Sequence, residues 1–70
     1  MNRRATDQEL KGMTVNERLF ACNLAGDFES AARTGNKRRM IEILEGVALT
    51  NDQASSTTQA ILKNPKKYGY

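Results

Sequence analysis

The chain has 70 residues, of which 39% are hydrophobic and 27% are charged, with a net charge of +3, one cysteine and no histidine. This length allows one small domain, near the size at which a single hydrophobic core is only marginally sufficient. The composition excludes the usual supports of small domains, because a lone Cys22 forms no internal disulfide and no cysteine–histidine cluster is present for structural zinc.

The positive charge is concentrated at the ends of the chain. Residues 63–70 carry +3 and residues 1–12 carry +1, whereas residues 13–62 carry −1. No apolar run has the length of a signal peptide or a membrane span, so we expect a cytoplasmic protein with no membrane partner.

Residues 1–12 are polar and basic, with little apolar surface beyond Leu10. Such a segment buries too little surface to order itself, so we expect a mobile polar arm. Met13 directly precedes a helix-start signal, a position at which a shorter version of the protein could begin, and the sequence does not decide between the two starts.

The first predicted helix begins with a capping box, Thr14-Val15-Asn16-Glu17. Four large apolar residues follow at helical spacing and form a stripe that needs a cover: Leu19, Phe20, Leu24 and Phe28. The pattern predicts a helix from Val15 to about Thr34. Ala25-Gly26-Asp27 lowers helix propensity, so either one helix bends near Gly26 or two helices meet there, and we favour one bent helix.

The second predicted helix covers Lys37 to Glu45, between Gly35 as a left-handed C-terminal cap with Asn36 as an N-cap and Gly46 as its end. The short connection predicts antiparallel packing on the first helix. Its buried face contains Met40, Ile41 and Leu44, with Val47 extending the face and Ile43 at the edge.

The third predicted helix covers about 51–63 and begins with a second capping box, Thr50 to Gln53. It buries Ala54, Ile61 and Leu62, and Pro65 ends it. Residues 65–70 form a basic tail, in which Tyr68 is expected to fold back onto the core. The predicted fold is therefore an all-α, three-helix domain over residues 13–64.

Three stretches carry a resemblance to known proteins: residues 14–20, the set Met40, Ile41 and Leu44, and Asn64-Pro65 before Tyr68-Gly69. They resemble a group of short helical proteins of proteobacteria with no assigned function. The resemblance covers about residues 13–69 and implies a compact helical fold in a bacterial protein. It carries over no functional residue.

The sequence contains no convincing catalytic or metal-binding set. Glu42 and Glu45 lie three residues apart and offer two carboxylates without a third ligand, which favours a solvated helix face over a cation site. Cys22 lies beside the apolar stripe, which favours packing over nucleophilic chemistry. We therefore expect no enzyme, no cofactor and no metal.

The basic run Lys37-Arg38-Arg39 occupies the first turn of a helix, where cations oppose the helix dipole. With Arg33 it forms a hypothetical site for an anion or an acidic partner. The alternative, which we favour, is a solvated corner in which Arg38 pairs with Glu42.

We expect a small helical module for protein interaction or regulation. Because a 70-residue core is marginal, the module is expected to form a homodimer in addition to binding an unidentified protein partner. The hypothetical dimer surface contains Leu19, Phe20 and Leu24. The alternative function is nucleic-acid binding through the basic helix start and the basic tail.

Overall fold

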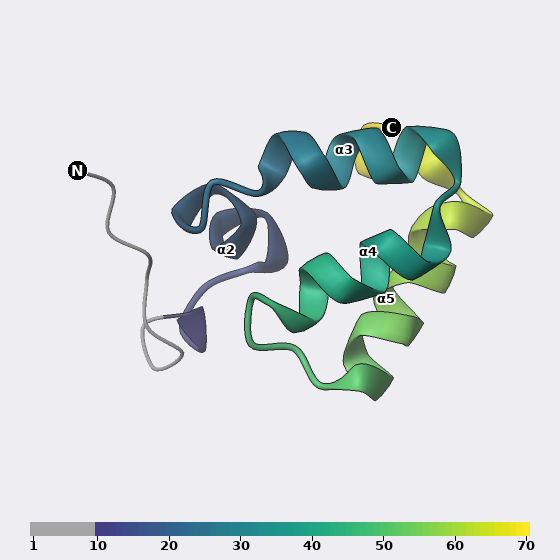
Figure 1. Cartoon of the computed structure of the whole chain (residues 1–70). Coiled ribbons are helices and arrows are strands. Elements are labelled where there is room, and N and C mark those ends of the chain that lie inside the picture. The colour runs from purple at the N-terminus through teal and green to yellow at the C-terminus, as the bar shows by residue number, and fades with distance from the viewer. Residues whose placement is uncertain (1–9) are drawn as a thin grey trace.

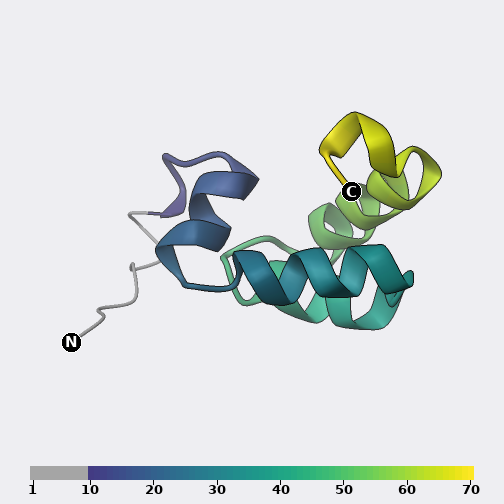
Figure 2. The same cartoon turned by 90° about the horizontal axis from the view of Figure 1, so that it is seen from above.

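The structure is a computed structural model that describes residues 10–70, and in this part of the chain it contains helices and no strand. The elements in chain order are α2 (Val15–Ala21), α3 (Ala25–Thr34), α4 (Lys37–Glu45), α5 (Asn51–Lys63) and a short 3-10 helix, η1 (Pro65–Tyr68). In Figure 1, α4 runs back along α3, as the short connection predicted. Figure 2 shows α2 at one end of α3 and η1 on the α5 side. The predicted all-α class is confirmed for these residues.

The first predicted helix is two helices, so the preference for one bent helix was wrong. α2 ends at Ala21, and Asn23 takes a left-handed φ of 58°. The amide of Asn23 donates to the Phe20 carbonyl at 3.1 Å, and the amide of Leu24 donates to the Leu19 carbonyl at 2.8 Å. This is a Schellman motif, in which asparagine occupies the position more often held by glycine. Gly26 lies within α3 and breaks nothing.

Two other helices end in the same way. Gly35 has a φ of 71° after α3, as predicted from its position. After α4, the left-handed residue is Ala48, with a φ of 70°, whereas Gly46 keeps a helical φ of −69°. The Leu49 amide donates to the Leu44 carbonyl at 3.3 Å across this turn. The backbone therefore stays coiled just beyond Gly46, which brings Val47 into the core.

The predicted helix starts are confirmed. Both capping boxes form. In the first, the Thr14 hydroxyl accepts from the Glu17 amide at 3.2 Å, and the Glu17 carboxylate accepts from the Thr14 amide at 2.9 Å. In the second, the Thr50 hydroxyl accepts from the Gln53 amide at 3.1 Å, and the Gln53 side chain accepts from the Thr50 amide at 3.0 Å. The Asn36 side chain accepts from the Arg39 amide at 3.2 Å. Each cap satisfies amides that the first helical turn leaves without partners.

The core is built around α4. Met40, Leu44 and Val47 are completely buried, and Ile43 is 3% exposed. These residues follow an i, i+3, i+4, i+7 pattern, which gives a broad apolar face. Met40, Leu44 and Val47 are buried as predicted, but Ile43, which was placed at the edge of the face, is inside, and Ile41 is half-buried. The contacts of α4 are most extensive with α5, where the fully buried Ala54 faces the core, and the predicted Leu62 is half-buried.

Arg18 has a structural role that the sequence did not reveal. Its Nε donates to the Met13 carbonyl at 3.1 Å, and its Nη1 donates to the Val47 carbonyl at 3.2 Å. The guanidinium thus joins the segment before α2 to the turn after α4. Charge-assisted hydrogen bonds of this kind are stronger than neutral ones, so Arg18 holds α2 against the rest of the domain.

The expected arm over residues 1–12 includes Leu10, which is 1% exposed and belongs to the core. The Leu10 carbonyl also accepts from the Met13 amide at 2.9 Å. Leu10 is therefore part of the folded body, contrary to the expected boundary at Met13. The rest of the expected arm, residues 1–9, lies outside the described residues.

Leu10→Ala should lower the free energy of unfolding by about 2–4 kcal/mol, because it removes a fully buried side chain and leaves a cavity. Chemical denaturation measures the loss, with Lys11→Ala as the matched control at an exposed neighbour. If both variants stay within about 0.5 kcal/mol of wild type, as surface substitutions do, Leu10 contributes no core packing.

Thr58→Val should raise the free energy of unfolding by about 1 kcal/mol. Thr58 is completely buried, and its Oγ1 has no hydrogen-bond partner among residues 10–70. Valine has nearly the same shape and a similar helix propensity, and it removes the cost of a buried, unpaired hydroxyl. Thr57→Val, at a half-buried neighbour, is the control and should change stability little. A destabilised Thr58→Val protein would show that the hydroxyl has a partner in solution.

Candidate functional groove

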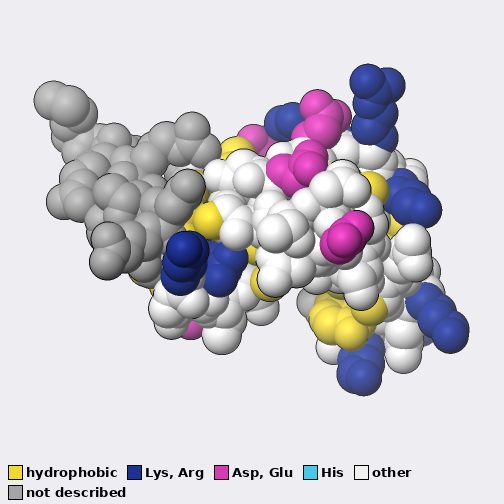
Figure 3. Space-filling view, turned by 90° about the horizontal axis from the view of Figure 1, so that it is seen from below, with side chains coloured by type: hydrophobic (Ala, Val, Ile, Leu, Met, Phe, Trp, Pro, Cys, Tyr) yellow, Lys and Arg dark blue, Asp and Glu magenta, His cyan; other side chains and the backbone are white. Residues whose placement is uncertain are grey.

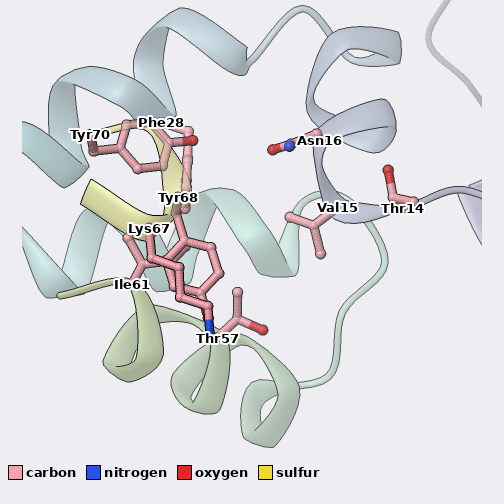
Figure 4. A pocket seen from close by; sticks show the side chains of 9 residues that line it. All are labelled: Thr14, Val15, Asn16, Phe28, Thr57, Ile61, Lys67, Tyr68 and Tyr70. Atoms are coloured by element: carbon pink, nitrogen blue, oxygen red, sulfur yellow. The ribbon is translucent and has the colours of Figure 1, made fainter. Parts of the chain in front are cut away.

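A groove with a volume of about 380 Å³ lies between the start of α2, the middle of α3, one face of α5 and the C-terminal turn. Figure 4 shows side chains from all four segments around it. The lining residues are Thr14, Val15, Asn16, Phe28, Thr57, Ile61, Lys67, Tyr68 and Tyr70. This volume lies within the range of ligand pockets, about 300–1,000 Å³.

Local sequence features place each wall of the groove. The Thr14 capping box positions the first turn of α2, so Val15 and Asn16 face the groove. Thr57 and Ile61 are four residues apart on α5 and therefore share one face of that helix. Between these two walls the floor is apolar, and it includes Phe28, which is 1% exposed.

The C-terminal turn closes one side of the groove. Pro65 starts η1, and the chain turns at Gly69, whose φ is 87°. The Tyr70 amide donates to the Pro65 carbonyl at 2.9 Å. The Tyr70 ring packs edge-on against Phe28, with the ring centroids 5.9 Å apart and the planes at 69°. Tyr68 was expected to fold back onto the core, and this prediction was wrong: Tyr70 packs on the core, and Tyr68 stays 44% exposed at the rim.

Lys67 is the one charged side chain among the residues that line the groove. Its Nζ lies 5.9 Å from the centroid of the Tyr68 ring, within the range of a cation–π contact. The other polar lining groups are hydroxyls and the Asn16 amide. The groove therefore combines an apolar floor with a positive rim.

Two pKa values are shifted near the groove. Burial, followed by the Glu29 carboxylate, raises the pKa of Tyr70 above its ordinary value of 10.0. At the other end, the Thr14 backbone amide and then the Thr14 hydroxyl lower the pKa of Glu17. Glu17 is therefore ionised at neutral pH while it caps α2.

The three residues of the expected dimer surface do not share one exposed face. Leu19 is 2% exposed in the core, Leu24 is half-buried at the turn between α2 and α3, and Phe20 is 77% exposed. The break at Asn23 separates Leu24 from the α2 helix and so disrupts the predicted stripe. Phe20 alone of the three presents a large apolar surface to solvent.

The expected basic site consists of exposed side chains. Arg33 forms an ion pair with Glu29 at 3.2 Å, and Lys37, Arg38 and Arg39 are exposed around the start of α4. The alternative pairing of Arg38 with Glu42 does not form among the described residues. Figure 3 shows Lys and Arg side chains at separate places around one face of the molecule. Anion and nucleic-acid binding stay predictions.

The structure places Cys22 in the core, 8% exposed and unpaired by any disulfide in the described region. This agrees with the predicted packing role. Glu42 and Glu45 are exposed, and residues 10–70 contain no group of three potential metal-ligating side chains. No helix in the described range has the length and apolar character needed to cross a bilayer.

The groove was missed by sequence analysis because its walls come from segments more than fifty residues apart in the chain. The one sequence feature that pointed to it was the pair of tyrosines after Pro65, but we expected Tyr68 to pack on the core, and Tyr70 does so. No family model, curated protein or solved structure matches the chain. The resemblance to short proteobacterial proteins therefore stays a prediction.

Tyr70 should ionise at a higher pH in the folded protein than in the denatured protein. The raised pKa means that the folded state favours the neutral phenol. The neutral phenol of Tyr70 therefore contributes to folding stability fully below pH 10, and this stabilisation is lost as the pH rises through the folded pKa. Absorbance titration of a Tyr68→Phe variant isolates the Tyr70 phenol. Glu29→Gln should move the midpoint part of the way back, and equal midpoints with and without denaturant would contradict the packing of Tyr70.

Proposed function

We propose that this chain is a small, non-catalytic protein-interaction module that self-associates, and that the groove is its binding surface. The observation that supports the proposal is the groove itself, with the apolar residues Val15, Phe28 and Ile61 bordered by two tyrosines. Tyrosine is enriched at protein interfaces because it combines a large apolar ring with one hydrogen-bonding group. The groove is thus suited to an apolar side chain from a protein segment.

The polar groups of the groove support binding more than catalysis. They are the hydroxyls of Thr14, Thr57 and the two tyrosines, the Asn16 amide and the Lys67 ammonium. Such groups orient a ligand by hydrogen bonds, whereas general acid–base catalysis at neutral pH needs a group whose pKa lies near 7. The chain contains no histidine to provide one.

The size of the domain supports self-association. A core of about a dozen buried side chains, several of them alanine, stabilises a chain of this length only modestly. Association with a second copy adds stability that grows with the logarithm of the protein concentration relative to the dissociation constant. The proposal includes a cytoplasmic location, supported by the single free cysteine, which is typical of a reducing compartment.

Thr57→Arg should abolish self-association while the domain stays folded, because the arginine side chain would fill the groove from its α5 wall. Ser56→Arg is the matched control: Ser56 is the preceding residue on α5, is exposed and does not line the groove. Sedimentation equilibrium from micromolar to near-millimolar protein measures association, and circular dichroism checks the fold.

Self-association of wild type and Ser56→Arg, together with a monomeric Thr57→Arg, is the expected result. If Thr57→Arg associates as tightly as wild type, the groove is not the binding surface. If wild type keeps a mass of 7.8 kDa and a constant melting temperature over the whole range, the module does not self-associate.

A further inference from the structure

Phe20 is a large aromatic side chain with no place in the core of its own chain. It is 77% exposed, and Tyr68 is the other large hydrophobic residue exposed within residues 10–70. Its neighbour Leu19 points inward and is 2% exposed, so the orientation of α2 directs Phe20 outward. The Schellman turn at Asn23 and the Arg18 hydrogen bonds hold α2 in this orientation.

Phe20 and the groove lie on the same side of α2. Asn16 lines the groove, and Figure 4 shows its side chain directed from α2 toward the interior of the groove. Phe20 is four residues later, which places it one helical turn beyond Asn16 on the same face. Phe20 is not among the lining residues, so it does not occupy the groove of its own chain. One face of the domain thus carries both an aromatic projection and an apolar hollow.

The two features match in size. The groove has a volume of about 380 Å³. A cavity of about 150 Å³ lined by apolar side chains accommodates benzene, so one phenyl ring fits here with space for part of the neighbouring helix. Tyr70, which packs edge-on against Phe28, provides an aromatic surface beside the floor, against which a further ring can pack.

The two features also match in charge. Glu17 precedes Phe20 by three residues on α2, so it flanks the phenyl ring, and its side chain is exposed. Its Oε1 accepts from the Thr14 amide at 2.9 Å, which leaves Oε2 for a second partner. The one charged side chain that lines the groove is that of Lys67. The projection is therefore negative where the groove is positive.

We propose that the groove binds Phe20 of a second copy of this chain, with Glu17 of that copy facing Lys67. A two-fold dimer requires a self-complementary face. A face with both a projection and its matching hollow meets this requirement, because the projection of each copy enters the hollow of the other and the contact forms twice. The inference rests on the proposed function and names its partner. It also assigns Phe20 and Glu17 as the residues that one copy contributes to the site of the other.

Phe20→Ala should weaken dimerisation by about 30-fold or more, the effect of truncating an aromatic anchor at an interface. Because Phe20 is exposed in the single chain, the melting temperature of the dilute, monomeric variant should equal that of monomeric wild type. Phe20→Trp provides a direct probe, since the chain has no other tryptophan. Its emission should shift to shorter wavelength as the dimer forms, and adding Thr57→Arg should prevent the shift.

A double-mutant cycle tests the charge pair. Glu17→Gln keeps the capping box, because glutamine reaches the Thr14 amide equally well, and it removes the charge. Glu17→Gln and Lys67→Gln should each weaken dimerisation by about threefold, the scale of an exposed ion pair, and the double variant should be no weaker than either single variant. Independent, multiplying effects would overturn the proposed pairing.

The outcomes separate this inference from the proposed function. If Thr57→Arg is monomeric but Phe20→Ala dimerises as tightly as wild type, the groove binds another segment, and the assignment of Phe20 is wrong. If the Phe20→Trp emission stays constant while the mass doubles, the aromatic ring remains in solvent and the assignment is equally wrong. Loss of dimer in Phe20→Ala, with the emission shift in Phe20→Trp, supports both.

Discussion

The structure depends on the burial of one face of α4 between α3 and α5. Met40 and Leu44 on α4, and Val47 just after it, are completely buried there, and no other helix of the described region buries so many large side chains so completely. Ala54 allows this packing, because it is fully buried near the start of α5 and its small methyl group lets the two helices approach closely. The remaining elements cover the edges of this unit: α3 adds Phe28 and two alanines, α2 adds Leu19, and the segment before α2 adds Leu10.

The helix ends determine which surfaces stay open. Three successive helices end in a left-handed residue followed by a reversal of the chain, at Asn23, Gly35 and Ala48. Each turn satisfies terminal carbonyls, so the chain can change direction within two or three residues without leaving unpaired groups. The turn at Asn23 has the greatest consequence for function, because it sets α2 at an angle to α3. Leu19 then enters the core, Phe20 faces solvent, and the start of α2 stands apart from α5 across the groove.

The groove follows from the small size of the domain. A chain of this length has few large side chains, and the core around α4 takes up most of those that are buried. The space between α2 and α5 is closed at one side by Tyr70 instead of by another helix, which leaves an apolar floor beside the Lys67 ammonium. Exposure of an apolar surface to water is unfavourable, and the free energy falls when an apolar group covers it. The same shortage of core that makes the single chain marginal therefore provides the surface on which our proposal of self-association rests.

Sequence by itself determined the features that neighbouring residues control. Both capping boxes, the Asn36 cap, the Gly35 turn and the bounds of α4 and α5 were predicted correctly, because each depends on hydrogen bonds or backbone conformations within about four residues. Only the tertiary structure decided the rest. Asparagine is compatible with both helix and left-handed turn, and burial of Leu19 and Leu24 at Asn23 selected the turn. Whether Ile41 or Ile43 faced inward depended on where α5 packs, and the Arg18 bond to Val47 spans 29 residues. The groove depends on the same long-range packing, because Asn16 and Tyr70 meet around it only after every helix between them has been placed.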